Sequence, residues 1–133
     1  MYNFLLMAHS GWRYLVLLAL AIAIVNYAIG WVRGGGWRKL DGTIATVAVI
    51  VTDIQLLFGL ILWPIAWGNH PLSSVRGMEH QVWMILAVAM MHVGYSRLKR
   101  SPERQKVQIA TMTFLVTLLL IALGVFRITG YII

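Results

Sequence analysis

The sequence predicts an all-α integral membrane protein: a four-helix bundle of up-down topology with both termini on the outer, non-cytoplasmic side. Three observations predict this fold. Hydrophobic residues make up 60% of the 133 residues and charged residues only 11%, whereas roughly a quarter of a soluble domain is charged. Four apolar stretches are long enough to cross a bilayer, and most basic residues lie in the short connectors between them.

Each predicted helix is an apolar stretch of the length that a hydrocarbon core requires, about 20 residues. The four stretches cover approximately 4–32, 43–67, 78–95 and 107–128 of a single domain, 1–133. We expect Gly30 and the glycines at 34–36 to end the first helix. We expect Asp41 or Thr43 to cap the second helix, and Pro64 to kink or end it.

The distribution of Lys and Arg predicts the orientation. The first and third connectors must share one side of the membrane, and they carry eight of the eleven basic residues: Arg33, Arg38, Lys39, Arg97, Lys99, Arg100, Arg104 and Lys106. Because cytoplasmic loops are enriched in Lys and Arg, this side is predicted to be cytoplasmic. Membrane topology thus explains the net charge of +7, and nucleic acid is not an expected partner.

The chain contains no cysteine. This excludes disulfides, thiolate metal sites, iron–sulfur clusters and covalent haem attachment through a CxxCH motif. Any metal must therefore be held by histidine, methionine, carboxylate or backbone groups.

Two histidines are expected at a similar outer level on separate helices. His9 lies one turn before Arg13, and His80 lies about one turn after Arg76. Two imidazoles that project inward at one level are what a bundle needs to ligate the iron of one b-type haem. Arg13, Arg76 and Arg127 map to the same outer ends, where they could pair with the haem propionates.

Simpler interpretations of these residues stay open. His9 could be an interfacial residue, with Arg13 extending to the lipid headgroups. Glu79 could pair with Arg13 or Arg127 merely to neutralise buried charge. The histidines could also bind another tetrapyrrole such as a chlorophyll, or the bundle could be a cofactor-free structural subunit of a larger assembly.

The remaining polar residues have less specific interpretations. His92 is expected to pack inside and bond a carbonyl group, with a proton or quinone role as the next alternative. Asp53 is either a hydrogen-bonded core residue or a proton-handling group near a quinone. His70 is expected to be solvent-exposed, and Met84 is a minor alternative as iron ligand.

A faint internal repeat accompanies the histidines. His9-x-x-Trp12 opens the first helix and His80-x-x-Trp83 opens the third. The two hairpins could be parallel repeats, but so short a match also arises by chance in an apolar sequence.

Several motifs resemble a group of small bacterial four-helix membrane proteins described as cytochrome b-like. These motifs are His9-Ser-Gly-Trp-Arg-Tyr14, the Gln-Leu-x-x-Gly pattern within Asp53–Gly59, Glu79-His80 and Gly94-Tyr-Ser-Arg97. The resemblance spans nearly the whole chain. It implies that His9 and His80 are haem ligands with Arg13 and Glu79 as neighbours, while His92 matches no fixed position.

Residues and resemblance together predict a membrane-embedded electron-transfer protein, or a haem-bearing subunit of a respiratory or photosynthetic complex. It would hold one bis-histidine haem b and exchange electrons near the outer face with a quinol or a protein partner. The expected location is the bacterial inner membrane, where other membrane subunits are candidate partners and a quinone is a candidate second cofactor. Because every connector is short, an accessory or electron-transfer role is expected rather than that of a stand-alone enzyme.

Overall fold

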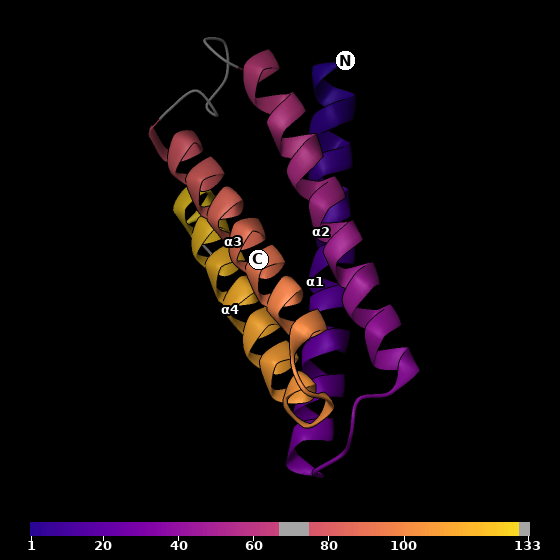
Figure 1. The fold of residues 1–133 in the computed structure, drawn as a ribbon. Coiled ribbons are helices and arrows are strands. Elements are labelled where there is room, and N and C mark those ends of the chain that lie inside the picture. The colour runs from indigo at the N-terminus through magenta and orange to yellow at the C-terminus, as the bar shows by residue number, and fades with distance from the viewer. Residues whose placement is uncertain (67–74, 131–133) are drawn as a thin grey trace.

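The computed structural model describes residues 1–66 and 75–130. Within them the chain forms four α-helices: α1 (Tyr2–Val32), α2 (Lys39–Ala66), α3 (Val75–Arg100) and α4 (Glu103–Thr129). The helices form a bundle in which the start of α1 and the end of α4 lie at the same end (Figure 1). The prediction of an all-α protein with four helices is confirmed.

The helices extend beyond the predicted apolar stretches. α2 begins at Lys39 rather than Thr43, α3 continues to Arg100 rather than Tyr95, and α4 begins at Glu103. An apolar stretch marks only the part of a helix that can lie in hydrocarbon, whereas charged residues such as Lys, Arg and Glu are good helix formers in water. The predicted end of the second helix at residue 67 lies outside the described residues.

The start of α2 differs from the prediction that Asp41 or Thr43 caps it. Arg38 precedes the helix, and Asp41 lies in its first turn, where Oδ2 accepts the backbone N–H of Arg38 at 2.8 Å. This is one half of a capping box. The Asp41 carboxylate is buried and also accepts bonds from Asn26 Nδ2 and Arg38 Nη2, both at 2.8 Å. Through these bonds Asp41 holds the connector residue Arg38 next to Asn26 of α1.

The glycines after residue 33 end α1, as the sequence predicts, whereas Gly30 lies within the helix. Gly34 adopts a positive φ of 64°, its N–H donates to the carbonyl of Trp31, and the N–H of Gly35 donates to that of Gly30. This pair of bonds is a Schellman motif, which requires a left-handed residue that glycine adopts without steric cost. Pro64, in contrast, does not end α2, which continues to Ala66.

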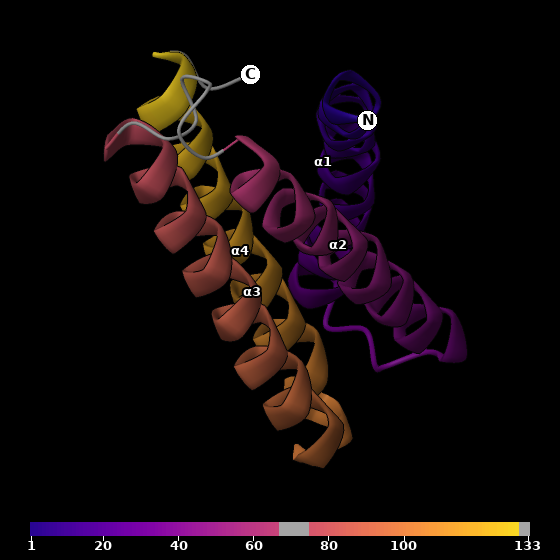
Figure 2. The same ribbon diagram turned by 90° about the horizontal axis from the view of Figure 1, so that it is seen from above.

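The bundle consists of two hairpins, α1–α2 and α3–α4, joined mainly by packing of α1 on α4. The packing of α2 on α3 is less extensive than that of α1 on α4, and the two hairpins are splayed in Figure 2. The connectors at residues 33–38 and 101–102 lie at one end, which we call the basic end. Tyr27 fills the core towards this end and stacks on Trp37 and Phe114, with ring centres 5.5 and 5.8 Å away.

Three of the helices, α1, α2 and α4, are long and apolar enough to cross a membrane. Among the described residues α3 does not meet this criterion, although it is 26 residues long, because polar side chains such as Glu79, Gln81 and His92 interrupt it. Large apolar side chains, such as Leu18 and Ile22 of α1, are exposed along the bundle. Soluble monomers rarely expose continuous apolar surface, so these surfaces are consistent with a membrane protein.

Candidate functional site

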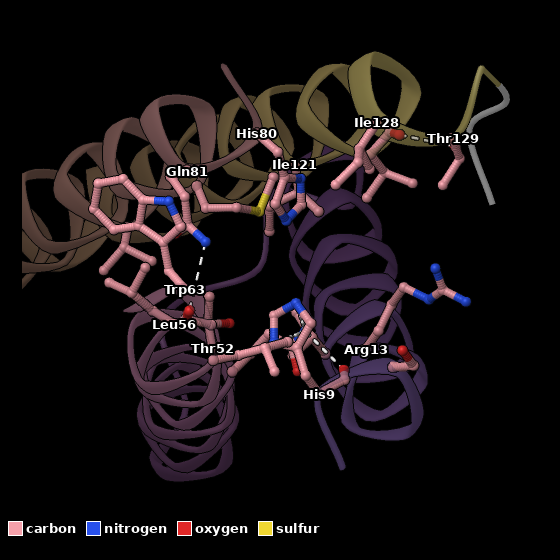
Figure 3. Close-up of a pocket in the computed structure, with 18 of the residues that line it drawn as sticks. His9, Arg13, Thr52, Leu56, Trp63, His80, Gln81, Ile121, Ile128 and Thr129 are labelled. Atoms are coloured by element: carbon pink, nitrogen blue, oxygen red, sulfur yellow. Dashed lines mark hydrogen bonds between the residues drawn. The ribbon is translucent and has the colours of Figure 1, made fainter. Parts of the chain in front are cut away.

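A cavity of about 220 Å³ lies between the two hairpins, towards the end opposite the basic end. All four helices line it, and its wall is mainly apolar (Figure 3). Both predicted haem-ligand histidines and one of the predicted arginines are among the polar side chains on the wall. These polar side chains belong to His9, Ser10, Arg13, Thr52, Gln55, Trp63, His80, Gln81 and Thr129.

The rings of His9 and His80 lie opposite each other across this cavity (Figure 3). Their centres are 6.3 Å apart and their planes are nearly perpendicular, at 88°. The structure therefore brings together the two histidines that the sequence singles out. From the sequence, their common level in the bundle could be inferred only by counting residues along each helix.

A backbone carbonyl holds His80. Its Nδ1 lies 2.9 Å from the carbonyl oxygen of Gly124 in α4, and the ring is buried. A carbonyl oxygen only accepts, so the proton of the neutral ring is on Nδ1 and the lone pair is on Nε2. Such a bond to the second ring nitrogen is the usual way in which proteins orient a metal-binding histidine.

Two residues of α2 hold His9. Gln55 Nε2 donates to the His9 carbonyl oxygen at 3.0 Å and lies 3.2 Å from Nδ1 of the ring. A Cβ added to Gly59 would lie only 3.1 Å from His9 Cε1. In the sequence, Gln55 and Gly59 stood out only as the two ends of the Gln-Leu-x-x-Gly pattern. The usable signal was their spacing of four residues, which places both on one helix face.

Each hairpin repeats one arrangement, in which a histidine of the first helix lies against a glycine of the second. His9 packs on Gly59, and His80 bonds the carbonyl of Gly124. At Gly124 a Cβ would lie 2.8 Å from Trp83 Cβ, so only glycine fits without movement. This shared arrangement accompanies the His-x-x-Trp motif near the start of α1 and α3.

The predicted arginines have different surroundings. Arg127 pairs with Glu79 through an Nη2–Oε2 contact of 2.6 Å. Of the two partners considered for Glu79, Arg13 and Arg127, the structure therefore shows Arg127. Arg13 lines the cavity, and its buried Nε has no hydrogen-bond partner within residues 1–66 and 75–130. Its Nη2 donates to Tyr14 at 3.1 Å. Arg76 lies in the first turn of α3, but its side chain is outside the described part.

The donor set fits a haem better than a bare metal ion. Among the described residues, no group of three or more His, Asp or Glu could hold a metal ion. A haem needs only axial ligands from the protein. A metal-bound imidazole nitrogen lies about 2 Å from the metal and the ring centre about 1 Å further out, so two imidazoles on opposite faces of one iron have centres about 6 Å apart. The observed 6.3 Å for His9 and His80 agrees with this value.

The cavity is smaller than the roughly 300–1,000 Å³ of typical small-molecule sites. A tetrapyrrole therefore needs side chains of the wall to move aside while His9 and His80 keep their 6.3 Å separation.

Asp53 and His92 form a pair that the sequence did not reveal. His92 Nε2 lies 2.8 Å from Asp53 Oδ1, and the two side chains are 50% and 41% exposed. The expectation that His92 packs inside and bonds a carbonyl is therefore wrong. Thr46 and Tyr95 also bond each other across α2 and α3, at 2.8 Å. We call the surface formed by these four residues the α2–α3 seam. His70 lies outside the described residues.

No protein-family model, curated protein or solved structure matches this chain. The functional inference therefore depends on the residues and their geometry.

Proposed function

We propose that the chain is a membrane-embedded electron-transfer protein, or the electron-transfer subunit of a larger membrane complex, that binds one b-type haem between His9 and His80. The opposed imidazoles at 6.3 Å are the observation that carries this proposal. When bound, the haem supplies reversible one-electron redox chemistry. His80 is oriented by Gly124 and His9 is held by Gln55 and Gly59, while the apolar wall excludes water.

A visible spectrum of the protein purified in detergent, oxidised and then reduced with dithionite, tests the proposal. Sharp reduced α and Soret bands of a low-spin haem are expected. A colourless preparation would overturn the proposal and leave a cofactor-free structural subunit. A red-absorbing band would indicate another tetrapyrrole on the same histidines.

We further propose that all four helices cross the bacterial inner membrane, with the basic end in the cytoplasm and both termini outside. The composition and length of α1, α2 and α4 support this placement. α3 is 26 residues long, and two of its polar side chains are already paired: Glu79 with Arg127 and His92 with Asp53. Pairing lowers the cost of placing such groups in a bilayer.

A reporter fused after Ile133 tests this orientation. A periplasmic phosphatase should be active at this position and a cytoplasmic reporter should be silent, because eight of eleven basic residues lie in the first and third connectors. A second fusion between Arg33 and Arg38 should give the opposite pattern. The reverse result at both positions would invert the proposed topology.

The Asp53–His92 pair supports a lipid-soluble quinol as the electron donor. Both side chains lie near half exposure on the α2–α3 seam, and an ionisable pair in contact with lipid tails is costly. Asp53 Oδ2 accepts no hydrogen bond from the described residues. We propose that it accepts one from a quinol hydroxyl, whose apolar tail then lies against lipid. If a quinol is not the donor, the electrons would come from a redox partner on the outer side.

Replacement of Asp53 by Asn should slow reduction of the purified protein by a hydroquinone by roughly 10-fold or more, because loss of one bond to a charged group costs about 1.5–3 kcal/mol. The dithionite-reduced spectrum should stay unchanged, since Asp53 does not line the cavity. Stopped-flow spectroscopy measures both. Equal reduction rates for the wild type and the variant would remove the quinol assignment but not the haem.

A further inference from the structure

A second cavity, of about 410 Å³, lies at the basic end between α2, α3 and the start of α4. All three lysines of the chain line it, Lys39, Lys99 and Lys106, whereas none of the arginines whose side chains the structure describes does. These lysines are far apart in the sequence and come from three helices, so the fold creates this concentration of ammonium groups.

The chain has too few carboxylates to neutralise this cavity. It contains four side-chain carboxylates in all, and each already has a partner. The pairs are Asp41–Arg38, Asp53–His92, Glu79–Arg127 and Glu103–Lys106. Lys106 is thus the one lysine of the three with a carboxylate partner. Lys39 and Lys99 have none among the side chains, and the Lys99 ammonium lies 4.6 Å from the centre of the Tyr95 ring.

The other groups of this cavity suit a phosphate at a bilayer surface. Thr46 and Tyr95 line its wall, where the Thr46 hydroxyl donates to the Gly42 carbonyl and the Tyr95 hydroxyl to Thr46. The ammonium groups are therefore the donors for a phosphate. Val47 also lines the cavity, and Ile50, about one turn further along α2, is 51% exposed. Apolar surface therefore continues from the cavity along α2.

We propose that this cavity binds the phosphate group of an anionic phospholipid, with Lys39 and Lys99 as its main cationic contacts. Basic pockets between membrane helices on the cytoplasmic side are suited to anionic headgroups. The apolar side chains beside the cavity favour a lipid over a free phosphate ion, because acyl chains can cover them. This site is at the opposite end from His9 and His80 and does not depend on the haem.

Native mass spectrometry of the full chain in a neutral detergent tests the proposal with phosphatidylglycerol and phosphatidylcholine as probes. The wild type should retain phosphatidylglycerol preferentially. The double variant Lys39→Gln/Lys99→Gln should bind it about 25-fold more weakly, since each lysine near an anionic headgroup contributes about a fivefold gain in affinity. The single variant Lys99→Gln, at an exposed position, should bind phosphatidylglycerol about fivefold more weakly than the wild type. It replaces the double variant in the test if the double variant does not fold.

The matched control is Arg33→Gln/Arg97→Gln. It removes the same charge from exposed positions at the same end, but neither arginine lines the cavity. An equal loss of affinity in the control and the lysine variants would overturn the site and leave only general charge attraction. Unchanged affinity in the lysine variants would also overturn the site. Inorganic phosphate at equal concentration should not displace the lipid. If it did, the ligand would be a free phosphate and not a lipid.

Discussion

Replacing either His9 or His80 by alanine should abolish the low-spin haem spectrum. Each variant removes one of the two opposed imidazoles, whose centres lie 6.3 Å apart, and no other histidine within residues 1–66 and 75–130 lines the cavity. The remaining imidazole can support at most a five-coordinate haem, with a broadened high-spin spectrum and weaker retention. Reduced-minus-oxidised spectra of the purified variants, with haem content per protein, measure the effect.

The variants should still fold. His80→Ala also removes the bond to the Gly124 carbonyl, which costs roughly 0.5–1.5 kcal/mol, and circular dichroism should show unchanged helix content. His92→Ala is the control, because His92 lies on the α2–α3 seam and does not line the cavity. Loss of the spectrum in this control with retention in both ligand variants would refute the assignment of His9 and His80.

The number of helices and the juxtaposition of the two histidines could be predicted from the sequence because both depend on position along a helix axis. Apolar length fixes where a helix lies, and residue counts from its ends fix the level of a side chain. His9 and His80 could therefore be placed at one level. Helix ends were less accurate, because the charged residues that follow the apolar part of α3 continue the same helix as far as Arg100.

The contacts around each helix axis could not be predicted in the same way. Asp53 and His92 were interpreted separately, since nothing in either helix alone shows that they face each other across α2 and α3. The same holds for Gln55, whose bond to the His9 carbonyl depends on the rotation of α2 against α1. In an almost wholly apolar chain, hydrophobic periodicity gives little information on rotation. Only packing at close contacts such as Gly59 against His9 defines it.

The surroundings of the arginines distinguish the candidates for binding a haem propionate. Arg13 and Arg127 were equal candidates for a haem propionate, and Glu79 could neutralise either. Because Glu79 pairs with Arg127, Arg127 already has its anion. Arg13 lines the cavity with a buried Nε that has no partner among the described residues. A buried N–H group without an acceptor is costly, so the propionate hypothesis now favours Arg13.

Arg13→Gln should therefore lower the midpoint potential of the bound haem by tens of millivolts and weaken haem retention roughly 5- to 150-fold. Loss of a nearby positive charge stabilises the oxidised form, and a charge-assisted bond contributes about 1–3 kcal/mol. Arg127→Gln should shift the potential much less, and should instead leave Glu79 without its 2.6 Å partner and lower thermal stability. Potentiometric titration of both variants distinguishes the two roles. Equal midpoints and full haem content in the wild type and Arg13→Gln would show that Arg13 anchors lipid headgroups and binds no propionate.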